Sequence, residues 1–208
     1  MFWTDIVHLK LGSDRQRDAY QALVELDLFA VLADYDPILA GSIPLGIATA
    51  ESDLDVICFA DDLDACARML EAVYGDEEEF SLTRKEKNGL PTLICRFHFR
   101  RFAVEVFAQP RPIEEQNAYR HMVAEARLLR EGGDDAFQAI RQLKREGMKT
   151  EPAFGEYFCL EGDPYQVLLD LADAPAHVVV DVVQQSRIIR RDRPEWPPDS
   201  QQTPTDGE

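Results

Sequence analysis

The sequence predicts an α+β fold, in which a mixed β-sheet is flanked by helices and followed by a helical C-terminal part. Strand-like segments alternate with helical ones up to residue 109, and helical periodicity dominates from residue 113 onward. Of the 208 residues, 45% are hydrophobic, which is enough to form a core. We expect three regions: an α/β core over 1–110, a helical part over 111–191 and a disordered tail over 192–208.

The first elements alternate between helix and strand. Ser13 is suited to cap one or two opening helices, whose apolar residues recur at close to helical spacing. A short apolar run then ends at Gly41, and after a loop we expect a strand over 52–60. Residues 61–75 predict a helix, with acidic residues in the first turn and a glycine as the stop.

Three further strands complete the predicted sheet, over 79–87, 91–100 and 101–109. An Asn-Gly turn joins the first two of them. The rest of the chain predicts helices over 113–133, 134–147, 163–172 and 177–191. The last of these is ambiguous because its valines favour a strand, whereas the preceding proline and the flanking helices favour a helix.

Two aspartates, Asp53 and Asp55, interrupt the apolar strand predicted over 52–60. Because alternate residues of a strand share one face, we expect both carboxylates to project together. A buried carboxylate needs a compensating cation or strong donors, and carboxylate oxygens are the ligands that Mg²⁺ prefers. The pair alone also fits a strand end whose acidic residues reach solvent, so a metal site depends on companion residues.

Those companions are present. Gly41 and Ser42 are separated from Asp53 by ten intervening residues; glycine lets the backbone approach a phosphate, and serine offers a hydroxyl and an N–H. Glu105 lies in the middle of another apolar strand, and a neighbouring strand would bring it beside the aspartates. Three carboxylates could then hold one or two metal ions.

This order of residues resembles the nucleotidyltransferase superfamily, which includes DNA polymerase beta and the aminoglycoside nucleotidyltransferases. The resemblance covers residues ~36 to 108. The stretches GSIPLGIATAESDLDVI, EEQNAYRHMVAEARLL and MKTEPAF look like a bacterial family of that superfamily catalogued as a domain of unknown function. The narrower resemblance implies a fold and leaves the substrate open.

The resemblance implies a role for each site residue. Asp53 and Asp55 would bind two magnesium ions, and Glu105 would bind metal and assist deprotonation of an acceptor. Ser42, next to Gly41, would hold the beta or gamma phosphate of a nucleoside triphosphate. Lys149 could reach phosphates across a cleft walled by the helical part, although a solvated lysine is the simpler interpretation.

The implied reaction is the transfer of a nucleoside monophosphate from a nucleoside triphosphate to a hydroxyl of a small molecule or a protein. Two alternatives stay open. The chain could be a non-catalytic member of the fold that binds a nucleotide or a protein partner. It could also act as an antitoxin paired with a separate helical toxin, an interpretation that rests on analogy alone.

Charge and cysteine usage limit the partners and the compartment. The 39 acidic residues exceed the 22 basic ones, and a net charge of -17 disfavours long nucleic acids and anionic membranes as partners. The four cysteines lack ligand spacing and are expected to be reduced thiols in the core. With no secretory h-region and no long apolar run, we expect a cytoplasmic protein.

Overall fold

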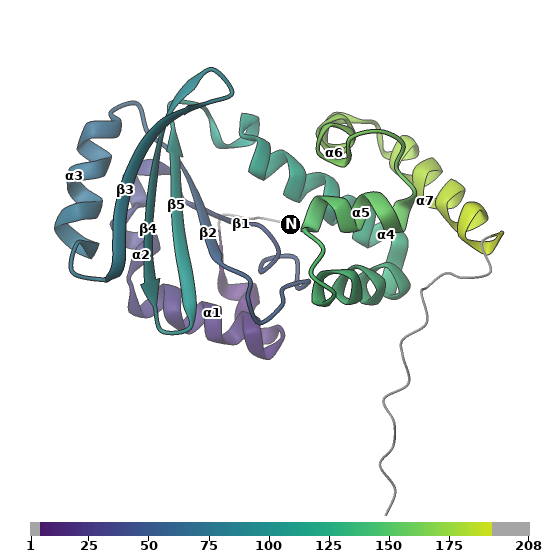
Figure 1. Ribbon diagram of the computed structural model, residues 1–208, viewed down its shortest axis with the longest axis horizontal. Helices are drawn as coiled ribbons and strands as arrows, with labels where there is room; N and C mark the ends of the chain where they lie inside the picture. The colour runs from purple at the N-terminus through teal and green to yellow at the C-terminus, as the bar shows by residue number, and fades with distance from the viewer. Residues whose placement is uncertain (1–4, 193–208) are drawn as a thin grey trace, which may run out of the picture. The chain divides into compact units, whose positions relative to one another are not determined.

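The chain forms a mixed sheet with helices, followed by a bundle of helices (Figure 1). The computed structural model describes residues 5–192. Their backbone divides into two compact units, the first ending at Ala126 and the second beginning at Arg127. The first unit contains the whole sheet and the second contains only helices. The predicted α+β class is confirmed.

The sheet has five strands in the order β1-β2-β5-β4-β3. Their bounds are Ile38–Ala40 for β1, Leu54–Phe59 for β2, Glu78–Lys87 for β3, Leu90–Phe99 for β4 and Phe102–Gln109 for β5. β2 and β5 are parallel, and every other neighbouring pair is antiparallel. This order places β5 between β2 and β4, so residues far apart in the chain become neighbours in the sheet.

The helices agree with most of the sequence-based expectations. Their bounds are Asp14–Glu25 for α1, Leu28–Val31 for α2, Leu63–Tyr74 for α3, Asn117–Arg145 for α4, Thr150–Phe158 for α5, Pro164–Asp173 for α6 and Ala176–Arg191 for α7, with 3-10 turns at Val7–Leu11, Ala33–Tyr35 and Ile113–Glu115. Ser13 caps α1 in a capping box with Gln16. The valine-rich segment is helical, and α4 is interrupted at Gly133, whose φ of 70° is not helical.

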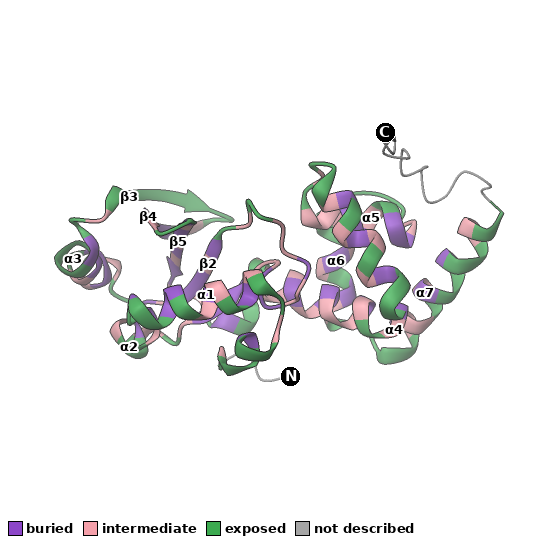
Figure 2. Cartoon of the chain, turned by 90° about the horizontal axis from the view of Figure 1, so that it is seen from below, coloured by how far each residue is buried: buried purple, intermediate pink, exposed green. Residues whose placement is uncertain are grey.

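The two faces of the sheet have different environments. Val56 of β2 and Val106 of β5 pack in one cluster with Leu23 of α1 and Leu70 of α3, so helices cover this first face. A second, smaller cluster lies on the opposite face and includes Ile57. Figure 2 shows β2 as mainly buried and β3 as mainly exposed. The polar side chains of the central strands must therefore lie on the second face.

One predicted strand boundary is wrong. The strand expected over 52–60 begins at Leu54, and Asp53 lies exposed in the loop before it. The backbone N–H of Ser52 donates to the Thr49 carbonyl (3.3 Å), which folds the chain into a turn there. Because this N–H is used locally, pairing with β5 starts at Leu54, opposite Val104. Asp55 is inside β2 and half-buried, as predicted.

The second unit is held by arginine contacts to backbone carbonyls. Arg127 donates to the carbonyls of Leu171 (2.6 Å) and Ala172 (2.9 Å), which satisfies the C-terminal end of α6. The guanidinium of Arg190 lies 3.9 Å from the ring centre of Tyr157 on α5. The helix α5 was not expected from the sequence pattern. The tail predicted to be disordered lies, apart from its first residue, outside the described residues.

The cysteines are free thiols, and Cys58, Cys66 and Cys95 are buried as expected. Burial raises the pKa of Cys66 to about 11, so this thiol is protonated at neutral pH. Cys159 is only partly buried, which corrects the expectation that all four lie in the core. None of the helices within residues 5–192 combines the length and the apolar character needed to span a bilayer.

Candidate functional site

Two carboxylates lie directly opposite each other in the middle of the sheet. Asp55 of β2 is the register partner of Glu105 of β5 in the parallel ladder. Residues opposite each other in a ladder share a face, and the neighbours of Asp55, Leu54 and Val56, both pack against the helices. Asp55 and Glu105 therefore lie on the second face. The structure thus brings Glu105 beside Asp55, as expected from the sequence.

The same register continues across the whole sheet. The residues aligned with Asp55 and Glu105, here called the Asp55 row, are Ala40 of β1, Arg96 of β4 and Ser81 of β3. The row ends at Ala40, and the next residue along the chain is Gly41. This position brings the start of the β1–β2 loop to the Asp55 carboxylate.

Gly41 is required where it stands. Its φ is +76°, a conformation that other residues adopt at a cost. A Cβ at this position would lie 2.8 Å from Oδ2 of Asp55, closer than carbon and oxygen can approach. The backbone at Gly41 therefore passes directly beside the carboxylate, closer than any residue with a side chain could.

The loop of residues 41–53, called here the 41–53 loop, is organised around Ser52. The Ser42 hydroxyl donates to Oγ of Ser52 (3.0 Å), and the backbone N–H of Thr49 donates to the same oxygen (2.9 Å). Ser52 directly precedes Asp53, so Ser42 is connected to the start of β2 through one side chain. Sequence reasoning missed Ser52, although a serine directly before the first aspartate was a visible indication.

The carboxylate of Glu105 acts electrostatically on Asp53. The pKa of Asp53 is raised above its ordinary value of 3.8, first by desolvation and then by the negative charge of Glu105. His98, Arg15 and Arg96 oppose this increase. Asp53 is thus close enough to the Asp55 row for the charge of Glu105 to raise its pKa, although Asp53 lies outside β2.

The raised pKa of Asp53 predicts a pH-dependent stability. Well below the ordinary pKa of about 4, the Asp53 carboxyl is protonated in both the folded and the unfolded protein. As the pH rises toward and through the raised pKa of the folded protein, the negative charge on Asp53 opposes folding. We expect Asp53→Asn to raise the Tm of the metal-free protein at pH 7, and the gain to shrink toward pH 4. Thermal unfolding between these values, followed by circular dichroism, measures the difference.

Asp62 provides the control of opposite sign. It is the N-cap of α3, and the backbone N–H groups of Ala65 and Asp64 lower the pKa of its carboxyl. Its charge therefore favours folding above its ordinary pKa. Asp62→Asn should lower the Tm at pH 7. If Asp53→Asn and Asp62→Asn changed the Tm in the same way, the repulsion assigned to Asp53 and Glu105 would be contradicted.

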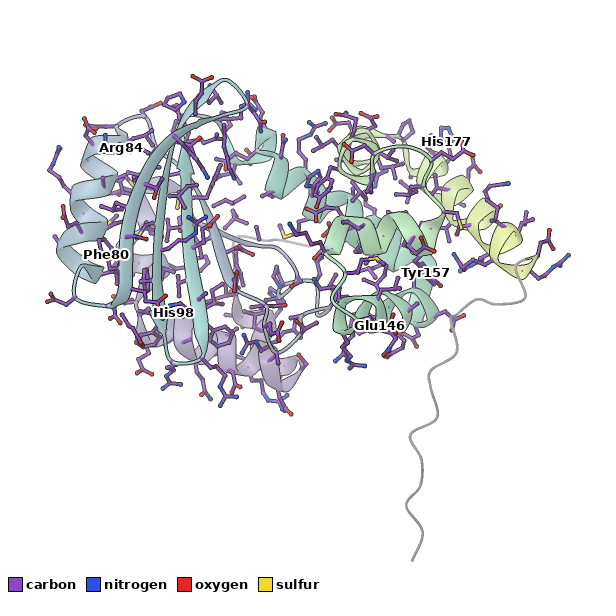
Figure 3. All side chains as sticks on the ribbon, in the orientation of Figure 1. Phe80, Arg84, His98, Glu146, Tyr157 and His177 are labelled. Atoms are coloured by element: carbon purple, nitrogen blue, oxygen red, sulfur yellow. The ribbon has the colours of Figure 1, made fainter. Side chains whose placement is uncertain are left out.

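Arg96 is a functional candidate that sequence reasoning missed. Its guanidinium forms an ion pair with Glu105, its partner in the Asp55 row. Two residues further along β4, on the same face, His98 lies 3.1 Å from the carboxylate of Glu79 (Figure 3). The available indication was an arginine inside the apolar strand β4, the same anomaly that identified Glu105.

The donor set fits a hard divalent cation such as Mg²⁺. Asp55 and Glu105 offer oxygen ligands from adjacent strands, and the backbone at Gly41 lies against the Asp55 carboxylate. Within residues 5–192, however, no group of three or more acidic, histidine or cysteine side chains is placed to share one ion. Oε2 of Glu105 is already paired with Arg96, which would compete with a metal ion for this oxygen.

The phosphate-binding candidates belong to different units. Gly41 and Ser42 lie in the first unit, near the carboxylates. Lys149 lies in the second, where it is exposed at the N-cap of α5 and its side chain makes no cap hydrogen bond. Its role in phosphate binding stays a prediction from the sequence.

Solved structures identify the fold. The chain is similar to Cid1, described as having RNA terminal uridylyl transferase activity, with a TM-score of 0.50 and 15% identity over 76% of this chain and 48% of that one. A structure of the Cid1 poly(U) polymerase with magnesium and 3'-dATP gives the same TM-score, identity and coverage. This chain spans about half the length of both. The chain therefore shares the fold of these two structures over most of its length.

Within that fold, the chain belongs to the family described as a domain of unknown function, DUF4269, whose model matches residues 21–171. The match extends over the sheet, the 41–53 loop and most of the helical unit, and it begins within α1. No curated protein matches the chain significantly.

Proposed function

We propose that this protein is a metal-dependent nucleotidyltransferase that transfers a nucleoside monophosphate from a nucleoside triphosphate to a hydroxyl of a small molecule or a protein. The observation that carries the proposal is the placement of Asp55 opposite Glu105, with the backbone of Gly41 against the Asp55 carboxylate. The nucleotidyltransferase-like fold supports it.

Each residue has a defined part in the proposed reaction. Asp53, Asp55 and Glu105 hold two magnesium ions, and Ser42 and the backbone at Gly41 bind phosphate oxygens. When bound, magnesium would neutralise the negative charge of the triphosphate and of the departing pyrophosphate. Glu105 also accepts the proton of the acceptor hydroxyl, which leaves the hydroxyl oxygen free to attack the alpha phosphorus.

The net charge of the chain limits the classes of acceptor molecule that we propose. A net charge of -17 repels a long polyanion, whereas it has little effect on a neutral or cationic acceptor. We therefore propose a small molecule or a protein, with no long nucleic acid and no membrane as partner. Only a local patch could override this field, and Arg96 in the Asp55 row is already paired with Glu105.

The direct test is thermal unfolding of the purified protein with ATP, GTP, CTP and UTP, each with and without magnesium. A ligand at about 100 times its Kd adds about 2.7 kcal/mol to the free energy of unfolding, or a Tm increase of roughly 5 to 10 °C for a chain of this size. We expect an increase that requires both nucleotide and magnesium. No increase with any of the four nucleotides would overturn the proposal.

A second candidate function is nucleotide or protein binding without transfer. The specific observation that favours it is the ion pair between Arg96 and Glu105, because this cation already neutralises the third carboxylate. The side chains are 49% and 27% exposed, so water screens the pair and its contribution to stability is small.

Replacing Arg96 separates the two functions. If Glu105 is a metal ligand, Arg96→Gln should strengthen magnesium binding to the nucleotide-free protein about two- to fivefold, because an exposed ion pair contributes up to about 1 kcal/mol. Isothermal titration with MgCl₂ measures it. The control is Arg84→Gln, which removes an arginine of β3 that pairs with Asp64 instead (Figure 3). Equal magnesium affinity in both variants would favour the second candidate.

A further inference from the structure

The first turn of α1 contacts both ends of the 41–53 loop. Nε2 of Gln16 donates to the carbonyl of Ile43 (2.9 Å), directly after Ser42. A nitrogen of Arg15 donates to the carbonyl of Ser52 (2.7 Å), directly before Asp53. Two neighbouring side chains of one helix thus bind the backbone next to a phosphate-binding candidate and next to a metal-binding candidate.

Arg15 is held firmly in this position. Its guanidinium lies 3.8 Å from the centre of the Phe102 ring, at the start of β5. Its Nε is buried without a hydrogen-bond partner among the described residues, a cost that a solvated arginine would avoid. Asp53 is also one of the charges that act on Arg15, so the guanidinium and this carboxylate attract each other electrostatically.

Gln16 is fixed by its role at the helix start. It is buried, and its Oε1 accepts the backbone N–H of Ser13 (3.0 Å) in the capping box. Because this bond fixes the orientation of the amide, Nε2 has to point away from the cap, toward Ile43. Folding of the first turn of α1 therefore places a donor against the 41–53 loop.

Both residues lie before residue 21, where the family match begins. The loop that they hold carries Gly41, Ser42 and Asp53 of the proposed ligands, and Ser52 links its two ends through the Ser42 hydroxyl. A loop without such anchors would sample many conformations, and ligand binding would have to select one of them.

We propose that Arg15 and Gln16 are positioning residues for the nucleotide site, which hold the 41–53 loop so that Ser42 and Asp53 stay in place beside Asp55. This inference rests on the proposed function. Neither residue touches the nucleotide; both act through the backbone of Ile43 and Ser52.

The test compares Arg15→Met and Gln16→Leu with the control Arg17→Met. Arg17 lies on the same helix but is exposed and pairs with Asp14. The probe is the magnesium complex of the nucleoside triphosphate that stabilises the unmodified protein most. We expect both test variants to weaken its binding about tenfold, which is about 1.4 kcal/mol, and Arg17→Met to leave it unchanged. Arg15→Lys, which keeps one charged donor, should restore part of the affinity.

A purely structural role makes a different prediction. It would lower the Tm of the free variants and leave nucleotide affinity unchanged, and that result would overturn the proposal. Hydrogen exchange of the ligand-free proteins provides an independent readout, because residues 42–53 should exchange faster in Arg15→Met than in Arg17→Met.

The two failures can be distinguished. If no nucleotide stabilises the unmodified protein, the proposed function is overturned. If nucleotide binds but the 41–53 loop exchanges equally in Arg15→Met and Arg17→Met, only the positioning role is overturned.

Discussion

Replacing Asp55 with asparagine is expected to abolish the magnesium-dependent stabilisation by nucleotide and to reduce any transfer at least about a hundredfold. Asparagine keeps the volume and most hydrogen bonds of the side chain but removes the charge that a hard cation requires. Asp55 is half-buried within β2, with Gly41 on one side and Glu105 opposite, so no other acidic residue can take its position. Thermal unfolding with each nucleotide, with and without magnesium, measures the effect.

Asp76→Asn is the matched control. Asp76 is exposed in the turn after α3, and its substitution removes the same charge far along the sequence from the candidate site. It should leave the nucleotide-induced Tm increase intact, and both variants should fold with an unchanged circular dichroism spectrum. An Asp55→Asn protein that still responds to nucleotide and magnesium as the unmodified protein does would show that Asp55 is not a metal ligand.

Most of the sheet could be predicted from sequence because its strands obey local rules. Runs of apolar, strand-favouring residues mark β4 and β5, and the Asn-Gly turn between β3 and β4 has positive φ at both Asn88 and Gly89. The cap of α1 was equally local, since Ser13 and Gln16 are three residues apart. Patterns of this length do not depend on the rest of the fold.

The position of Asp53 could not be predicted in the same way. Alternation extends the apparent strand back to Ser52, but the N–H of Ser52 is used in a turn with Thr49 and its carbonyl accepts from Arg15. One of these partners is on another element, so only the folded chain reveals where β2 begins. The anomaly of Glu105 was visible in the sequence, whereas its pairing with Arg96 depended on strand order.

The helix α5 was overlooked although local indications existed. Glu151 and Pro152 lie in its first turn, where an acidic residue and a proline are favourable. Ala153, Phe154 and Tyr157 then bury one side. The segment is short, and without its tertiary contacts a helix of this length is marginal.

Replacing Gly41 with alanine is expected to impair nucleotide binding as severely as the loss of a ligand. Its φ of +76° costs an alanine about 1 to 2 kcal/mol. In addition, the new Cβ would lie 2.8 Å from Oδ2 of Asp55, so either the carboxylate or the start of the 41–53 loop must move. We expect a lower Tm for the free protein and a nucleotide affinity at least about tenfold weaker.

Gly89→Ala isolates the second effect from the first. Gly89 has nearly the same φ, +73°, in the β3–β4 turn, but a Cβ there meets nothing within 4 Å. Both variants therefore carry the same backbone cost, and only Gly41→Ala disturbs Asp55. A loss of Tm common to both, with nucleotide affinity reduced only in Gly41→Ala, assigns that reduction to the approach of Gly41 to the carboxylate. Equal nucleotide affinity in the two variants would mean that this approach serves the fold and not the site.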